Sequence, residues 1–253
     1  MKIAYFDCFS GISGDMTLGA LIDAGLKFSD LKFELSKLKL AGYKLSISKV
    51  KRAGIIATKF NVEITQKSKS SRDINDIIKI INKSFLSSNV KIQSKNIFLK
   101  LADVEAKIHN KKINQIHFHE VGAIDSIIDI VGTAIAIEKL EIDEIYSSSV
   151  NLGYGTIKCE HGILPVPAPA TAHLMQGIPV YSTKISGVDN IELTTPTGAV
   201  ILKTLVKEFG KMPSIEIKNI GYGAGNSDFK NYPNVLRVFI SDEDPIGEET
   251  KQY

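Results

Sequence analysis

Two closely spaced histidines mark the part of the chain best suited to chemistry. In an extended segment, residues two positions apart point to the same face, so His117 and His119 would face one way. Glu120 follows at once, and Asp125 and Asp129 are spaced to share one face of the helix that we expect next. Two imidazoles and three carboxylates are the composition of a site for a borderline metal ion.

The same residues have an ordinary structural explanation. The histidines could end a strand, and carboxylates are common near helix N-termini because of the helix dipole. However, the helix expected over residues 122–140 is apolar nearly all round, which is typical of a buried helix. A buried carboxylate is costly unless it is paired, hydrogen-bonded or bound to a metal. We therefore favour a polar functional site that includes Asp125 and Asp129.

A run of small residues near the N-terminus could bind a phosphate. It follows an expected strand and opens an expected helix, where backbone amides and the helix dipole attract an anion. It matches neither the Walker pattern nor the dinucleotide fingerprint, and its structural alternative is a tight turn capped by Ser13. The Asp15 carboxylate would repel a bare phosphate, so it would instead bind a metal ion that bridges to the phosphate, or a ribose hydroxyl. The candidate residues are Ser10, Gly11, Ser13, Gly14 and Asp15.

A second helix start carries hydroxyl groups at Thr195 and Thr197, on either side of Pro196. A threonine cap and a proline in the first turn explain it structurally. An anion site is the alternative.

Cys159 and His161 place a thiol and an imidazole close together in a loop. Their spacing does not match a zinc finger, and the partners of a catalytic cysteine are usually distant in sequence. Thiolate and imidazole both suit an ion such as nickel, so we expect them as additional metal ligands.

The composition limits the class of protein. The chain has 253 residues, 43% of them hydrophobic, which suffices for one large domain or two smaller ones. Lys and Arg number 31 and Asp and Glu number 28, and this balance does not indicate nucleic-acid binding. We see neither a signal-peptide pattern nor an apolar run that could span a membrane. Cys8, expected as a buried hydrophobe, and Cys159 cannot form a disulfide framework, so we expect a reduced, cytoplasmic compartment.

The apolar pattern predicts an α/β or α+β protein, with a mixed sheet flanked by helices and a mostly helical middle subdomain. We expect an α/β body over 1–70 and 141–240, a helical subdomain over 72–140 and a frayed tail over 241–253. Residues 152–169 read as loop-rich, and 221–225 as a glycine turn. Strands are predicted over 2–9, 43–50, 55–65, 144–151, 214–220 and 234–240. Helices are predicted over 16–24, 29–38, 72–85, 95–109, 122–140, 169–173 and 196–209.

Four segments together resemble one known family, the nickel-insertion proteins of lactate racemase cofactor maturation. They are YFDCFSGISGDM at 5–16, HFHEVGAIDS at 117–126, HGILPVPAPAT at 161–171 and ELTTPTGA at 192–199. The resemblance runs from residue 1 to about 240.

The resemblance implies an enzyme, a nickel chelatase or cyclometallase of the lyase class. It would insert nickel into a pyridinium-3,5-bisthiocarboxylic acid mononucleotide and form nickel–carbon and nickel–sulfur bonds. The product would be the nickel-pincer nucleotide cofactor, with lactate racemase as its recipient. The resemblance also implies CTP with manganese or magnesium, bound by a C-terminal domain that we expect this chain to lack. Either a separate chain supplies that domain, or the chain is a truncated or frameshifted product, or it has another use. We further expect a homo-oligomer.

The lead hypothesis assigns a role to each candidate residue. His117 and His119 would be the main nickel ligands, with His161 and Cys159 secondary. Glu120 would be a ligand or a proton acceptor, and Asp125 and Asp129 would orient the imidazoles. Two alternatives stay open, a non-enzymatic nickel metallochaperone and a metal-dependent phosphoester hydrolase.

Overall fold

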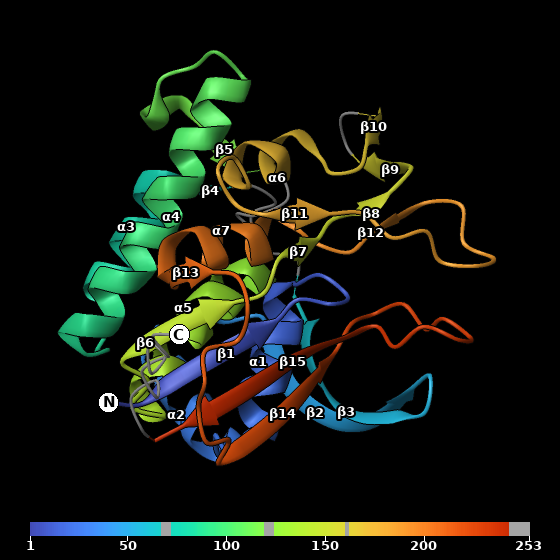
Figure 1. Cartoon of the computed structure of the whole chain (residues 1–253). Coiled ribbons are helices and arrows are strands. Elements are labelled where there is room, and N and C mark those ends of the chain that lie inside the picture. Colours follow the sequence, from blue (N-terminus) through green and yellow to red (C-terminus); the bar gives the residue numbers. More distant parts are fainter. Residues whose placement is uncertain (67–71, 119–123, 160–161, 243–253) are drawn as a thin grey trace, which may run out of the picture.

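The computed structural model describes residues 1–66, 72–118, 124–159 and 162–242 (Figure 1). Its centre is a mixed sheet of seven strands in the order β13-β6-β1-β15-β14-β3-β2. The expected α/β class with a mixed sheet is confirmed. The strands are β1 (Ile3–Asp7), β2 (Tyr43–Arg52), β3 (Ile55–Ile64), β6 (Glu144–Ser147), β13 (Val206–Phe209), β14 (Asn219–Ala224) and β15 (Val235–Ser241).

Strand β1 occupies the middle of this sheet because its residues are apolar on both faces. It pairs parallel with β6 and antiparallel with β15. Ile3, Ala4 and Phe6 are completely buried. A central strand covered on both sides has a continuous apolar sequence. The turn at residues 10–13 follows β1 and therefore lies at the end of the sheet.

Helices pack on the sheet and on one another. Helix α1 (Gly14–Asp23) lies on β14 and β3, and α5 (Ile124–Lys139) lies on α1. Helices α2 (Phe28–Ser36), α4 (Ser88–Ile108) and α7 (Pro196–Leu205) contact α5, and α3 (Ile74–Lys83) contacts α4. The predicted burial of α5 is confirmed, since most of its residues are buried.

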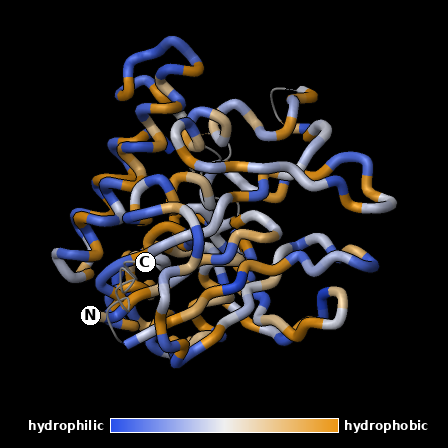
Figure 2. The backbone as a smooth tube through the Cα atoms, viewed as in Figure 1, coloured by the Kyte–Doolittle hydropathy of each residue, from blue (hydrophilic) through white to orange (hydrophobic). Residues whose placement is uncertain are grey.

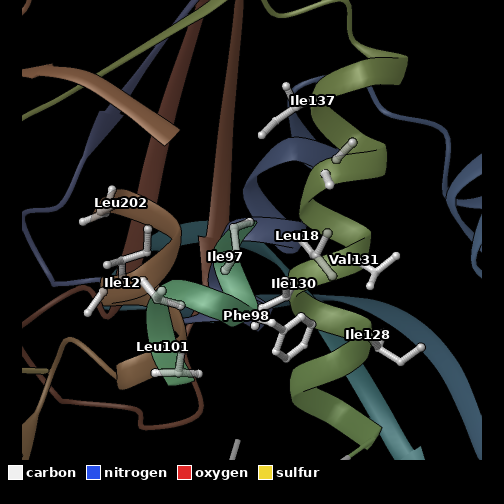
Figure 3. Packing of buried hydrophobic residues seen from close by; sticks show 14 of the residues in the cluster. Ile12, Leu18, Ile97, Phe98, Leu101, Ile128, Ile130, Val131, Ile137 and Leu202 are labelled. Atoms are coloured by element: carbon white, nitrogen blue, oxygen red, sulfur yellow. The ribbon is translucent and has the colours of Figure 1, made fainter. Parts of the chain in front are cut away.

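The contact between α1 and α5 is close because a glycine faces a leucine. A Cβ added to Gly132 would lie 3.0 Å from Cδ1 of Leu18. Figure 3 shows Leu18 beside Ile130 and Val131 of α5, with Ile97 and Phe98 of α4 on the same side. In Figure 2 the hairpin of α3 and α4 alternates orange and blue along its length, as expected for helices with one apolar face.

A region of short strands lies beyond the edge of the sheet (Figure 1). Residues 152–169 were expected to be loop-rich, and this expectation is wrong, because they contain paired strands. Within this segment β9 pairs with β10, and β8 pairs with β12 further along the chain; β7 and β11, just outside the segment, form another pair. Their bounds are β7 (Val150–Asn151), β8 (Gly153–Tyr154), β9 (Thr156–Cys159), β10 (Gly162–Pro165), β11 (Val180–Tyr181) and β12 (Ile191–Glu192), and helix α6 spans Pro169–Leu174. A further pair joins β4 (Arg72–Asp73) to β5 (His117–Phe118), after the short 3-10 helix η1 (Ile113–Gln115).

Several predicted elements have different bounds in the structure. Helix α4 begins at Ser88, seven residues before the predicted start, because Ser87 caps it by accepting a hydrogen bond from the amide of Val90 at 3.2 Å. The predicted helix over 196–209 ends at Leu205, and its last four residues are strand β13, paired with β6. The strand predicted over 144–151 is interrupted between β6 and β7.

Residues 221–225, predicted to form a glycine turn, lie mostly in a strand. Residues 219–224 form strand β14, and 214–218 are not strand. The glycines are required there by close packing, since a Cβ on Gly221 or Gly223 would collide with backbone atoms of α1. Within the described part of the chain, none of the helices combines the length and apolar character needed to cross a bilayer.

Candidate functional site

A cavity of about 680 Å³ gathers residues that are far apart in the sequence. Its walls come from the starts of α1, α5 and α7, from β3, β9 and β12, and from the segment after β14. Seven residues predicted from the sequence line it, namely Ser13, Gly14, Asp15, Asp125, Asp129, Thr195 and Thr197. The structure thus brings three of the predicted clusters together.

The start of α1 is a capped helix N-terminus. The Ser13 hydroxyl accepts a hydrogen bond from the amide of Met16 at 3.4 Å and donates one to the Asp15 carboxylate. Ser10 is completely buried, and Gly11 has a φ of +71°. Neither of them is among the described residues that line the cavity.

The start of α7 is joined to the same turn by backbone hydrogen bonds. The amide of Ile12 donates to the carbonyl of Leu193 at 3.0 Å, and the amide of Thr195 donates to the carbonyl of Ile12 at 3.0 Å. The Thr195 hydroxyl then caps α7 by accepting from the amide of Gly198 at 3.2 Å. Two helix N-termini, each a partial positive charge, therefore open into one cavity.

Sequence reasoning missed Lys59, which lies in strand β3 and lines the cavity. Its ammonium group forms a salt bridge with the Asp15 carboxylate, and the two side chains are only 9% and 20% exposed. A signal was present in the sequence, since Lys59 interrupts a run of small and apolar residues in a predicted strand. Without the fold, that lysine could not be assigned a partner.

Asp129 is the least satisfied polar group of the cavity. Its Oδ1 atom is buried and has no hydrogen-bond partner among the described residues. The side chain packs against Gly14, where an added Cβ would collide with it. Burial raises the pKa of Asp129 well above its usual value, and the nearby Asp15 and Asp125 carboxylates raise it further, while Lys59 lowers it.

Asp125 lies one helical turn before Asp129, in the first turn of α5. It is exposed, and its Oδ1 atom accepts a hydrogen bond from the amide of Ser126 at 2.8 Å. Unlike Asp129, it faces solvent at the cavity edge.

The predicted metal ligands are described only in part. His119, Glu120 and His161 lie outside the described residues. The backbone of His117 pairs with Asp73 in the β4–β5 ladder. Cys159, partly exposed, ends β9 next to Lys158, which lines the cavity. Within the described ranges, no three His, Cys, Asp or Glu side chains form a metal-binding group, so the ligand set stays a prediction.

Comparisons with known proteins agree on one family. The family described as nickel insertion protein matches residues 4–253. The pyridinium-3,5-bisthiocarboxylic acid mononucleotide nickel insertion protein of Geobacillus kaustophilus is 51% identical over 97% of this chain and 61% of its own length. The protein of the same name from Clostridium kluyveri is 45% identical over 100% of this chain and 65% of its own.

A putative nickel insertion protein of Dictyoglomus thermophilum is 49% identical over 96% of this chain and 61% of its own length. No solved structure matches. The chain therefore spans less than two thirds of the length of these curated relatives. On the family match and these identities, the chain belongs to the nickel insertion protein family.

Proposed function

We propose that this chain takes part in the insertion of nickel into pyridinium-3,5-bisthiocarboxylic acid mononucleotide, and that the cavity binds the nucleotide. The reaction is inferred from the names of the relatives in Geobacillus and Clostridium. The observation that carries the site is the meeting of two helix N-termini with a carboxylate group in one cavity of about 680 Å³. The phosphate of a nucleotide would lie at a helix N-terminus, and its ring would lie near the carboxylates.

The start of α7 is the better phosphate site of the two. Its first turn contains no acidic residue, and Thr195 and Thr197 line the cavity there. The start of α1 holds the Asp15 carboxylate, which already accepts from the amide of Met16 at 3.0 Å. An anion is therefore favoured at α7, and a cation near α1 and α5.

Nickel would bind beside the ring. His117 and His119 are the proposed main ligands, His161 and Cys159 the secondary ones, and Glu120 a ligand or proton acceptor. Imidazole and thiolate suit nickel, and ligands on separate segments would keep a coordination position open for the substrate. Cys159 ends β9, the strand from which Thr156, Ile157 and Lys158 line the cavity.

Several finer points belong to the proposal. The reaction would fall in the lyase class and would use CTP with manganese or magnesium. Lactate racemase would receive the product, and the protein would be a homo-oligomer. A simple nickel carrier would bind nickel but not the nucleotide. A phosphoester hydrolase would hydrolyse generic phosphoesters. Assays of nucleotide binding and of phosphoester turnover therefore distinguish these two functions from nickel insertion.

The first test is calorimetry of nickel binding to this chain, with and without the bisthiocarboxylate mononucleotide. We expect about one nickel per chain, bound more tightly when the nucleotide is present. Mass spectrometry of the released nucleotide then reports the inserted metal.

The paired change His117→Ala and His119→Ala should abolish stoichiometric nickel binding without unfolding the protein. His173→Ala is the matched control, because His173 is exposed on α6 and does not line the cavity. Unchanged nickel affinity in a folded double variant would refute the ligand assignment.

A further inference from the structure

Among the described residues, no side chain pairs with the Asp129 carboxylate. Its Oδ1 atom is buried without a hydrogen bond to any described residue. Lys59, whose charge lowers the pKa of Asp129, is engaged in the salt bridge to Asp15. A buried carboxylate is costly unless something pairs with it, which points to a ligand that supplies the missing positive charge.

The charges of the cavity indicate which kind of cation fits. Its described lining carries four carboxylates against two lysines, so the cavity carries excess negative charge. These groups are Asp15, Asp125, Asp129 and Glu192, with Lys59 and Lys158. The described carboxylates do not form a metal-binding group. An organic cation needs no such set of ligands, because one carboxylate beside it is enough.

The two ends of the cavity differ in the charge they favour. The α7 start offers hydroxyls and a helix N-terminus without an acidic residue, whereas Asp129 lies on α5 against Gly14 at the start of α1. A ligand that is anionic at one end and cationic at the other would satisfy both. A pyridinium mononucleotide is such a molecule, because its phosphate is negative and its ring nitrogen carries a fixed positive charge.

We infer that Asp129 pairs with the positively charged ring of the bound mononucleotide and makes the site selective for a ring that carries this charge. The identity of the nucleotide rests on the proposed function. A fixed charge matters here because a pyridinium ring cannot lose it to solvent, as a protonated amine can. The fixed positive charge favours the ionised form of the Asp129 carboxylate, which burial and the neighbouring carboxylates disfavour.

The test uses two ligands that differ mainly in ring charge, nicotinamide mononucleotide and its 1,4-dihydro form, whose ring is uncharged. Calorimetry on the wild-type chain should show at least about tenfold tighter binding of the charged form, as expected for a desolvated charge pair. Asp129→Asn, which keeps the side-chain shape, should lose most of this preference and change the affinity for the dihydro form by less than about threefold. Asp103→Asn is the control, since it removes a carboxylate from α4 outside the cavity.

A second measurement needs no variant. Wild-type titrations in two buffers of different ionisation enthalpy should show more proton release with nicotinamide mononucleotide than with the dihydro form, because the ring charge lowers the pKa of Asp129. The groups acting on Asp129 are Asp15 from α1, Lys59 from β3 and Asp125 from its own helix. Asp15→Asn should therefore decrease the proton release, because it removes one of the charges that raise the pKa of Asp129.

Three results would overturn the inference. They are equal wild-type affinity for the two forms, no binding of either form, and a charge preference that survives in Asp129→Asn. If nickel insertion occurs but the preference survives in the variant, only the role of Asp129 fails. If the preference depends on Asp129 but no nickel is inserted, the ring recognition stands and the proposed reaction fails.

Discussion

The Asp129 carboxylate predicts an unusual dependence of stability on pH. Its pKa is raised in the folded protein by burial and by the nearby carboxylates. Protonated Asp129 therefore stabilises the fold below the ordinary aspartate pKa of about 3.9, and this contribution is lost as the pH rises through the raised value. The Asn variant has no such loss, so its stability advantage over wild type should grow with pH.

The advantage should reach on the order of 1–3 kcal/mol, the usual cost of an unsatisfied buried polar group. Urea denaturation of wild type and Asp129→Asn at several pH values between 4 and 8 measures it. Asp103→Asn should follow the wild-type curve. A difference in unfolding free energy that does not change with pH would contradict the assigned pKa direction.

The two cysteines should react at very different rates. Cys8 is completely buried, and burial raises its pKa to about 12, so hardly any thiolate is available. Cys159 is partly exposed at the end of β9. A thiol reagent should label one cysteine quickly in the native protein and the second only in denaturant.

The same experiment tests Cys159 as a metal ligand. Nickel should slow its labelling if the thiolate coordinates the ion, whereas magnesium should not, because it prefers oxygen ligands. Unchanged labelling with saturating nickel would remove Cys159 from the proposed ligand set.

At the scale of single residues, the sequence indicated which residues are functional candidates better than it indicated their partners. Asp129 was predicted because it interrupts an apolar helix, and this signal is local. Lys59 was missed because its partner Asp15 lies on another element, and only the packing of β3 beside α1 brings them together. Local patterns mark unusual residues, but the fold decides which residues meet.

Strand β14 shows why one element was predicted wrongly. A cluster of glycines ordinarily indicates a turn. Here the glycines permit the backbone of α1 to approach the strand, a requirement that depends on a helix about two hundred residues earlier in the chain. Helices α1 and α5 were predicted nearly correctly because their apolar periodicity is contained in the helix itself.

Gly223→Ala should therefore be strongly destabilising. An added methyl would collide with the carbonyl oxygen of Met16 and the amide of Ala20, and helix α1 would have to move away from the sheet. We expect a loss of about 3 kcal/mol or more. Because α1 carries Ser13 and Asp15 into the cavity, nucleotide binding should weaken in the same variant.

Gly54→Ala is the comparison for this change. Gly54 has a φ of +93° and no heavy atom within 4 Å of an added Cβ, so only the backbone strain of about 1–2 kcal/mol applies. Chemical denaturation ranks the two variants. Equal losses would mean that the close approach of α1 to β14 has little energetic consequence.

The core of the molecule crosses the predicted boundary between the body and the helical subdomain. One hydrophobic cluster contains Phe6 of β1, Leu18 of α1, Ile77 of α3, Phe98 of α4 and Ile128 of α5. Figure 3 shows the central part of this cluster around α5. A helix buried between two parts of a chain couples them, because neither part can unfold without exposing it. We therefore expect the body and the helices of residues 72–140 to unfold together.

The distribution of tyrosines makes this coupling measurable. All eight tyrosines lie outside residues 72–140, and the chain has no tryptophan, so tyrosine fluorescence reports on the rest of the chain and not on these helices. Ellipticity at 222 nm comes mainly from helices, the longest of which are α4 and α5 in the middle of the chain. Coincident urea transitions by the two signals would show one cooperative unit. An earlier loss of ellipticity would show that the helical region unfolds separately, and the cavity wall formed by α5 could then open without unfolding the sheet.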